Sequence, residues 1–357
     1  MLEGMDERIE GWRPRCGPPR TPLVRPVRID PAGLTGPTPG QSRGPRWRRT
    51  SHGYFVPAEV SGECPEQRVM EQSVRLPSGG GVTGWAACRL RGAAFFDGLG
   101  GDGTTRLPVP LAVGPTHLVR KDPAARVSRD SLDGERITLV QDIPCVPVRR
   151  AVFDAMRWAP GVRQATVAID MAAAAELVSV TLMRAYVEGR SGWRGVPKVR
   201  RALDLADENS MSPGETRMRL VWVLDAGLPA PLCNQPVWDL RGNLLGVADL
   251  LDPVAGVVGE YDGAAHRGAG RHRRDVARED RFRRAGLEYV KVVGLDLTDT
   301  RLLVERMLTT RRRARFLPPG ERAWTLAPPE DWYDSPLDAM TLDQRLEYRA
   351  VVHGAPG

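Results

Sequence analysis

The sequence predicts an α/β protein of about two domains. Its 357 residues exceed the usual size of a single domain. Short apolar runs of strand length alternate along the chain with segments whose apolar residues recur at helical spacing. The clearest succession lies in the C-terminal half, where a helix, three strands, a helix and a strand follow one another. The three strands are expected at residues 232–240, 244–251 and 257–262.

Residues 1–60 form the first segment. Pro and Gly account for 18 of these 60 residues, a share typical of disordered sequence. We therefore expect a largely disordered N-terminus. Residues 47–57 have the sequence WRRTSHGYFVP, which predicts one strand near the end of the segment.

Residues 64–205 are expected to form a mixed α/β middle domain. Asp154 and Asp170 lie on predicted helices among apolar residues, which favours salt-bridged helix faces over a catalytic role for them. Helices are expected at residues 65–74, 83–90, 147–158, 162–174, 179–187 and 196–205, and strands at 107–113 and 137–141.

The αβββαβ unit, residues 206–315, opens with a helix whose start is marked by three residues. Ser212 is a favoured N-cap, Pro213 fits the first helical position, and Glu215 stands three residues after the cap. This spacing is that of a capping box. Glu215 is therefore expected to cap the helix, and a second role for its carboxylate is not excluded.

A hairpin with facing acids follows. The sequence DPVAG at residues 252–256 predicts the turn. If the turn is centred on its third and fourth residues, Asp249 and Glu260 lie equally far from it and point to the same side. Strand side chains alternate between faces, so Asp262 shares the face of Glu260.

Facing carboxylates predict a cation. Like charges opposite each other across two strands destabilise a sheet, and a bound cation removes that repulsion. Carboxylate oxygens without nearby cysteines suit Mg²⁺ or Mn²⁺ better than zinc. Two other interpretations stay open: the acids stand at solvated strand ends, or the register is shifted by one residue and sends them to opposite faces.

The helix expected after the hairpin is strongly basic. Residues 266–315 contain 15 Arg or Lys against 7 acidic residues. Four arginines recur three or four residues apart, so they share one helix face and are expected to contact consecutive phosphates. Interleaved acids also allow a self-paired, solvated face. The four arginines are Arg271, Arg274, Arg278 and Arg281.

Together these residues carry a family resemblance. The order αβββαβ resembles the restriction-endonuclease-like core of the PD-(D/E)xK superfamily, and more narrowly the very-short-patch-repair (Vsr-like) endonuclease domain. The matching pieces are Ser-Pro-Gly-Glu at 212–215, Asp249 on a strand, and Glu-Tyr-Asp-Gly-Ala-Ala-His at 260–266. The resemblance covers about residues 205–310.

The resemblance implies metal-dependent hydrolysis of phosphodiester bonds in DNA, in repair or in defence against mobile elements. Asp249, Glu260 and Glu215 would bind Mg²⁺ or Mn²⁺, and His266 would transfer a proton. Asp262 stands where the wider superfamily has a lysine, so Lys291 is a candidate substitute. The Cys/His zinc-binding elements of the repair enzymes are not recognisable in this chain.

The middle domain resembles the corresponding part of AbiEi-type antitoxin proteins, and residues 47–57 resemble the wing strand of their winged-helix module. Two other functions therefore remain open. The chain could be an antitoxin-type transcriptional regulator that binds DNA through a non-catalytic nuclease fold, or a protein-interaction module. Salt-sensitive DNA binding without cleavage would identify the first, and absence of such binding would identify the second.

The net charge of +7 favours DNA as partner. The five cysteines are odd in number and dispersed, which indicates reduced thiols. No apolar run is long enough to cross a membrane and no signal sequence is recognisable, so a cytoplasmic protein without a membrane partner is expected. A homodimer stays open.

Residues 316–357 reverse the charge, with 7 acidic residues and 3 arginines. Trp324, Trp332 and Tyr333 are expected to pack this extension on the nuclease domain, and residues 341–351 predict a short helix. A sharper alternative is an acidic strap that competes with DNA for the basic helix.

Overall fold

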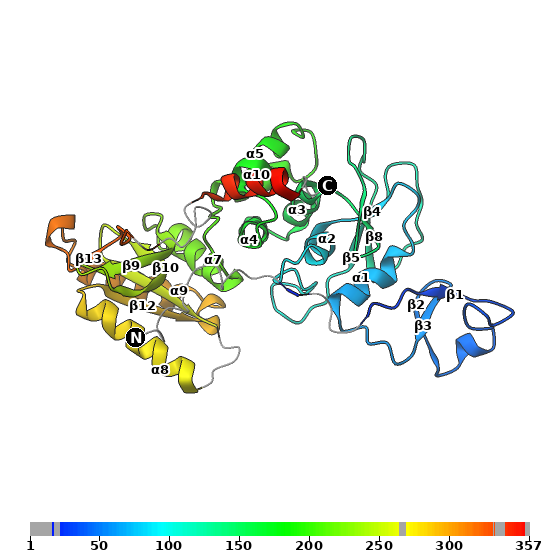
Figure 1. The fold of residues 1–357 in the computed structure, drawn as a ribbon, viewed down its shortest axis with the longest axis horizontal. Coiled ribbons are helices and arrows are strands. Elements are labelled where there is room, and N and C mark those ends of the chain that lie inside the picture. Colours follow the sequence, from blue (N-terminus) through cyan, green and yellow to red (C-terminus); the bar gives the residue numbers. More distant parts are fainter. Residues whose placement is uncertain (1–15, 18–21, 264–268, 331, 333–339, 354–357) are drawn as a thin grey trace. The chain divides into compact units, whose positions relative to one another are not determined.

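The computed structural model describes residues 16–17, 22–263, 269–330, 332 and 340–353. The described chain is mixed α/β and divides into two compact units (Figure 1). Of the described residues, 204–345 belong to the C-terminal unit, and 16–203 together with 346–353 belong to the N-terminal unit. Among the described helices, none is long and apolar enough to cross a membrane.

The first sheet of the N-terminal unit departs from the expected disorder. Strands β1 (Val27–Arg28), β3 (Tyr54–Pro57) and β2 (Trp47–Ser51) form an antiparallel sheet in that order, and a 3-10 turn, η2 (Gln41–Arg43), lies between β1 and β2. The Asp30 carboxylate accepts three backbone N–H groups of the following loop at 2.9 Å. Proline and glycine therefore serve ordered turns here, and the prediction of disorder is wrong for residues 22–60.

The second sheet has the strand order β6-β5-β4-β8-β7. Side-chain burial is nearly complete on its central strands, and the helices of this unit bury valine, alanine and methionine side chains. Strands β4, β6 and β8 are additional to the expected ones, because each is too short to show periodicity. The elements are α1 (Pro65–Ser73), β4 (Gly81–Val82), α2 (Gly84–Leu90), β5 (Val109–Ala112), β6 (Ala125–Ser128), β7 (Thr138–Val140) and β8 (Ile143–Cys145).

Four further helices complete the core of this unit. The expected salt-bridged face is present, since the buried Asp154 accepts from Arg150 at 3.0 Å and from Arg157 at 2.7 Å. Both contacts follow helical spacing, and a buried carboxylate requires such partners. The helices are α3 (Val148–Trp158), α4 (Val162–Ala174), α5 (Val180–Glu188) and α6 (Val196–Asp204).

The C-terminal unit contains one five-stranded sheet, in the order β12-β11-β10-β9-β13. All neighbours pair antiparallel except β11 and β12, which are parallel. The helix, three strands, helix and strand of the sequence prediction occur in that order. They are α7 (Pro213–Leu220), which continues into the π-helical turn η3 (Val221–Asp225), β9 (Leu232–Asp239), β10 (Leu244–Asp252), β11 (Val257–Asp262), α8 (Ala269–Arg284) and β12 (Glu288–Val293).

Helices cover both faces of this sheet. On one face, Met218 of α7 and Met307 of α9 (Arg301–Arg313) pack against Leu250 and Val290. On the other, Phe282 of α8 packs against neighbouring strand residues, including Val258. Because adjacent strand residues alternate between the two clusters, the strands are buried on both sides, as their continuous apolar runs require.

The C-terminal extension packs on this sheet through tryptophan, as expected. Strand β13 (Trp324–Thr325) pairs with β9, and the Trp332 ring meets Trp238 edge-on with centroids 5.2 Å apart. Short 3-10 turns, η4 (Gly294–Leu297) and η5 (Pro319–Glu321), flank α9. The expected final helix is α10 (Leu342–His353). Its residues from 346 on belong to the N-terminal unit, within which Arg349 pairs with Glu176.

Candidate functional site

The β10–β11 hairpin has the register that the sequence predicts. Leu250 pairs with Gly259 and Leu251 with Val258, and the ladder ends one residue before Asp249 and Glu260. The turn is held by the Asp252 carboxylate, which accepts the N–H groups of the second and third residues after it at 3.0 Å. Glu260 lies on the face covered by α8, because its carboxylate pairs with Arg278 of that helix.

Asp249 and Glu260 are both buried, with exposed fractions of 7% and 3%. Asp249 Oδ2 accepts the backbone N–H of Tyr261 at 2.7 Å. Glu260 Oε2 lies 2.6 Å from Nη2 of Arg278. Glu260 Oε1 is buried and has no hydrogen-bond partner among the described residues. A buried carboxylate oxygen without a partner is costly unless a ligand satisfies it.

Glu215 reaches the same region from the start of α7. Ser212 caps the helix as expected, accepting the Glu215 N–H at 3.2 Å. The Glu215 carboxylate itself is buried and accepts the N–H of Met211 at 2.8 Å. Gly214 between them is required by packing, since a Cβ there would lie 1.9 Å from the Tyr261 ring. This close approach seats the helix N-terminus on β11.

Asn234 is a site residue that sequence reasoning missed. Its Nδ2 donates to Glu215 at 2.7 Å and to the carbonyl of Asn209 at 2.6 Å. The residue has a φ of +45°, a left-handed conformation that asparagine tolerates better than most residues. An asparagine inside an expected strand was the one signal available, and it does not identify its partner.

The three carboxyl groups influence one another electrostatically. Burial, followed by the charges of Glu260 and Glu215, raises the pKa of Asp249 well above its usual range. Burial raises the pKa of Glu260 to about 7, although the Arg278 charge opposes the rise. Burial also raises the pKa of Glu215, against the hydrogen bond from Asn234. Among the described residues, Arg278 is the cation whose charge acts on both Asp249 and Glu260, and it does not offset the effect of burial.

These shifts predict that the protein loses stability as pH rises. Glu260 has a higher pKa folded than unfolded, so its stabilising contribution is complete below about pH 4.5 and is lost as pH passes 7. The loss is on the order of 3 kcal/mol, from about 1.4 kcal/mol per pKa unit. Chemical denaturation in a chelating buffer between pH 5 and pH 8 measures it. Glu260→Gln should flatten this dependence, and a wild-type curve that rises with pH would contradict the assignment.

Asp262 and Lys291, which are predicted to support the site, form an ion pair with each other. Lys291 Nζ lies 3.0 Å from Asp262 Oδ2. Lys291 is in register with Glu260 on the neighbouring strand, so its side chain rises from the same sheet face. Its ammonium is engaged by Asp262 at the edge of the cluster, which leaves Arg278 as the cation on Glu260.

Two of the four arginines predicted on the basic helix contact protein groups. Arg278 turns inward to Glu260, and its stem lies against Gly246, where a Cβ would be 2.9 Å from Cγ and Cδ. Arg281 Nε donates to the Leu245 carbonyl at 2.7 Å. Arg283 pairs with Glu279 at 2.9 Å, as the self-paired alternative predicts. Arg278 and Arg281, two of the four predicted arginines, therefore contact the sheet.

Three predicted residues cannot be placed. His266 lies outside the described residues, and so do the side chains of Arg271 and Arg274. Within the described part of the chain, no group of three or more His, Cys, Asp or Glu side chains is arranged as a ready metal site. The guanidinium of Arg278 lies against Glu260. The donor chemistry still fits a hard divalent cation, since the buried carboxylates lie close enough to shift one another's pKa and Glu260 Oε1 lacks a partner among the described residues.

Comparison with protein-family models, with curated proteins and with solved structures gives no match. The function must therefore be argued from the chain's own residues.

Proposed function

We propose that the C-terminal unit is an Mg²⁺- or Mn²⁺-dependent endonuclease that hydrolyses phosphodiester bonds in DNA. The observation that carries the proposal is the buried pair Asp249 and Glu260, with Glu260 Oε1 left without a partner among the described residues. The order α7, β9, β10, β11, α8, β12 supports it, because it is the order of the PD-(D/E)xK core that the motifs resemble.

Asp249 and Glu260 would hold the cation, with Glu215 near it. The cation would lower the pKa of a water and offset the charge that develops on the phosphate. Asn234 orients Glu215 through its hydrogen bond, so it is a positioning residue. His266 is the proposed proton-transfer group, and it follows β11 by a few residues.

Arg278 has two tasks in this proposal. Without a cation, it neutralises Glu260 at 2.6 Å. A bound cation would neutralise Glu260 in its place, and the guanidinium would then be available to a DNA phosphate, which it can hold with two parallel hydrogen bonds. Asp275 lies 3.6 Å from the same nitrogen and is a second carboxylate that holds the guanidinium beside Glu260.

The Arg278–Glu260 ion pair also favours a second candidate. A guanidinium on Glu260 can serve as the permanent counter-ion of a fold that has no catalytic metal. The chain would then be a DNA-binding regulator of the antitoxin type. This candidate predicts salt-sensitive DNA binding with no metal-dependent cleavage.

Incubation of the purified protein with supercoiled plasmid and with short mismatched duplexes separates these functions. Nicked or cut products are expected with Mg²⁺ or Mn²⁺ and not with chelator, and Glu260→Gln should remove them. Salt-sensitive binding of intact DNA under every metal condition would instead establish the regulator. If no salt-sensitive binding occurs, the protein-interaction module remains as the explanation.

A further inference from the structure

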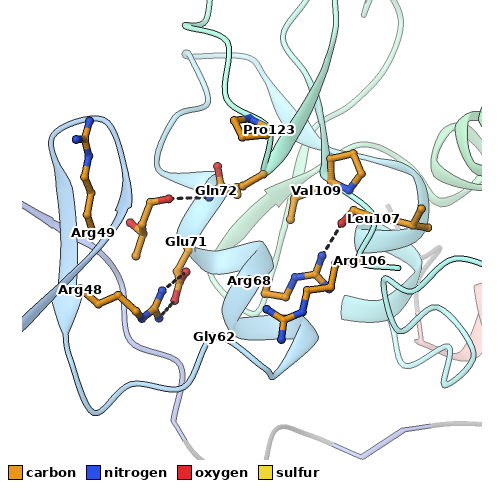
Figure 2. A pocket seen from close by; sticks show the side chains of 13 residues that line it. Arg48, Arg49, Gly62, Arg68, Glu71, Gln72, Arg106, Leu107, Val109 and Pro123 are labelled. Atoms are coloured by element: carbon orange, nitrogen blue, oxygen red, sulfur yellow. Dashed lines mark hydrogen bonds and ion pairs between the residues drawn. The ribbon is translucent and has the colours of Figure 1, made fainter. Parts of the chain in front are cut away.

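The N-terminal unit has two adjoining pockets beside the β2–β3 hairpin. The smaller, of about 300 Å³, and the larger, of about 630 Å³, share Arg49, Thr50 and Pro123 as lining residues. Figure 2 shows the smaller pocket, where Arg48 turns onto Glu71 with an ion pair of 2.6 Å. Both volumes lie in the range of small-molecule sites.

Basic side chains dominate the larger pocket. Its lining contains five arginines and lysines and one histidine, but a single acid, Asp122. That carboxylate lies 4.0 Å from Arg75 and accepts the Ala124 N–H. Within the described residues, no carboxylate forms an ion pair with the other four cations. They are Arg28, Arg49, Arg120 and Lys121.

The pocket is held together by buried polar groups. The Arg75 side chain is 7% exposed and donates to Gln72 at 2.9 Å and to the Arg120 carbonyl. It thereby fixes the loop that carries Arg120 and Lys121. Ser51 lines the pocket, is 4% exposed, and has a hydroxyl without a hydrogen-bond partner among the described residues. A buried hydroxyl facing a cationic pocket is suited to an anionic oxygen.

The lining also contains aromatic and apolar side chains. The Arg28 guanidinium lies over the Tyr54 ring at 5.0 Å and donates to its hydroxyl at 3.0 Å. Leu118 is 85% exposed at the rim, and Leu76 adds apolar lining. A ligand that joins phosphate to a flat apolar ring matches both kinds of lining, because bases stack on aromatic and guanidinium surfaces.

We propose that the larger pocket binds the phosphate and base of a nucleotide, the chemistry shared by a free nucleotide and a nucleic-acid strand. Arg49, Arg120 and Lys121 hold the phosphate, Ser51 donates to it, and the Tyr54–Arg28 pair receives the base. The inference concerns a second site in the N-terminal unit and does not depend on the proposed cleavage by the C-terminal unit.

Binding in chelator tests the pocket, with fluorescence anisotropy of a short labelled single strand and competition by ATP and by inorganic phosphate. Combined Arg49→Ala and Lys121→Ala should weaken binding of the nucleotide ligand at least tenfold. If the strand is that ligand, the log-log salt dependence should fall by about 0.7 for each phosphate that the variant no longer neutralises. The matched control is Arg200→Ala with Arg201→Ala, which removes the same charge from the exposed face of α6, outside the pocket lining.

Hydrogen exchange on the full chain locates the bound ligand and separates this site from DNA binding elsewhere. Protection is expected at residues 47–57 and 118–123. If ATP alone protects them, the ligand is a free nucleotide, and if only the strand does, the ligand is nucleic acid. Equal weakening by both double variants, protection by inorganic phosphate alone, or no protection of these segments would overturn the proposal.

Discussion

Asp249→Asn is expected to abolish metal-dependent cleavage while leaving the chelated protein as stable as the wild type or more so. The Asp249 carboxylate is a proposed metal ligand, and asparagine lacks its negative charge. Loss of a group that only supports a ligand costs 10- to 100-fold, so loss of a ligand should exceed roughly 10²-fold. Stability should not fall, because the amide oxygen can still accept the Tyr261 N–H and one of three mutually repelling charges is gone.

Initial rates of plasmid nicking and thermal unfolding in chelator measure both parts of this result. Asp280→Asn is the matched control, since it makes the same chemical change on α8 in an exposed pair with Arg284. Surface pairs of this kind contribute about 0–1 kcal/mol, so the control should cleave and unfold like the wild type. Undiminished cleavage by Asp249→Asn would remove the carboxylate pair from the mechanism.

Binding of Mn²⁺ gives an independent readout of the same substitution. Calorimetry should show that Asp249→Asn and Glu260→Gln each weaken Mn²⁺ binding, because each removes a charged oxygen from the cluster. Equal affinity for Mn²⁺ in the wild type and in both variants would leave the DNA-binding regulator as the better account of the chain.

The hairpin shows how far local sequence determines the candidate site. The apolar runs on either side of the DPVAG turn were sufficient to predict the pairing of Leu250 with Gly259 and of Leu251 with Val258. The helix start was equally predictable, because Ser212 caps α7 through a contact between near neighbours in the chain. Both features depend on interactions within a few residues.

Arg278 and Asn234 could not be assigned in the same way. Helical spacing showed that four arginines share a face of α8, but only tertiary packing decides that this face turns toward Glu260 and the Leu245 carbonyl. Asn234 meets Glu215 across 19 positions of the sequence, with no motif to connect them. Residues 22–60 were misjudged for a related reason, because composition measures how many turns a segment has and not whether strands pair between them.

Arg278→Met is expected to destabilise the chelated protein strongly at pH 8 and only slightly at pH 5. Methionine keeps the packing of the stem beside Gly246 but leaves Glu260 buried without its counter-ion. Breaking such a pair costs roughly 3 kcal/mol or more when the remaining carboxylate is charged. At pH 5 Glu260 is protonated, because burial already raises its pKa to about 7 with Arg278 present, so the substitution has little effect there.

The effect of a divalent cation on the stability of Arg278→Met distinguishes a metal site from a permanent ion pair. If the guanidinium occupies the place of a metal, Mn²⁺ should restore most of the stability that Arg278→Met loses at pH 8. Mn²⁺ should also bind the variant more tightly than the wild type, since the competing guanidinium is gone. DNA cleavage should nevertheless fall, because methionine cannot hold the phosphate. Arg283→Met breaks the more exposed pair with Glu279 on the same helix and should change stability by less than about 1 kcal/mol at either pH. Failure of Mn²⁺ to stabilise Arg278→Met would show that Glu260 evolved to hold an arginine, and the C-terminal unit would then be a scaffold for binding and not a nuclease.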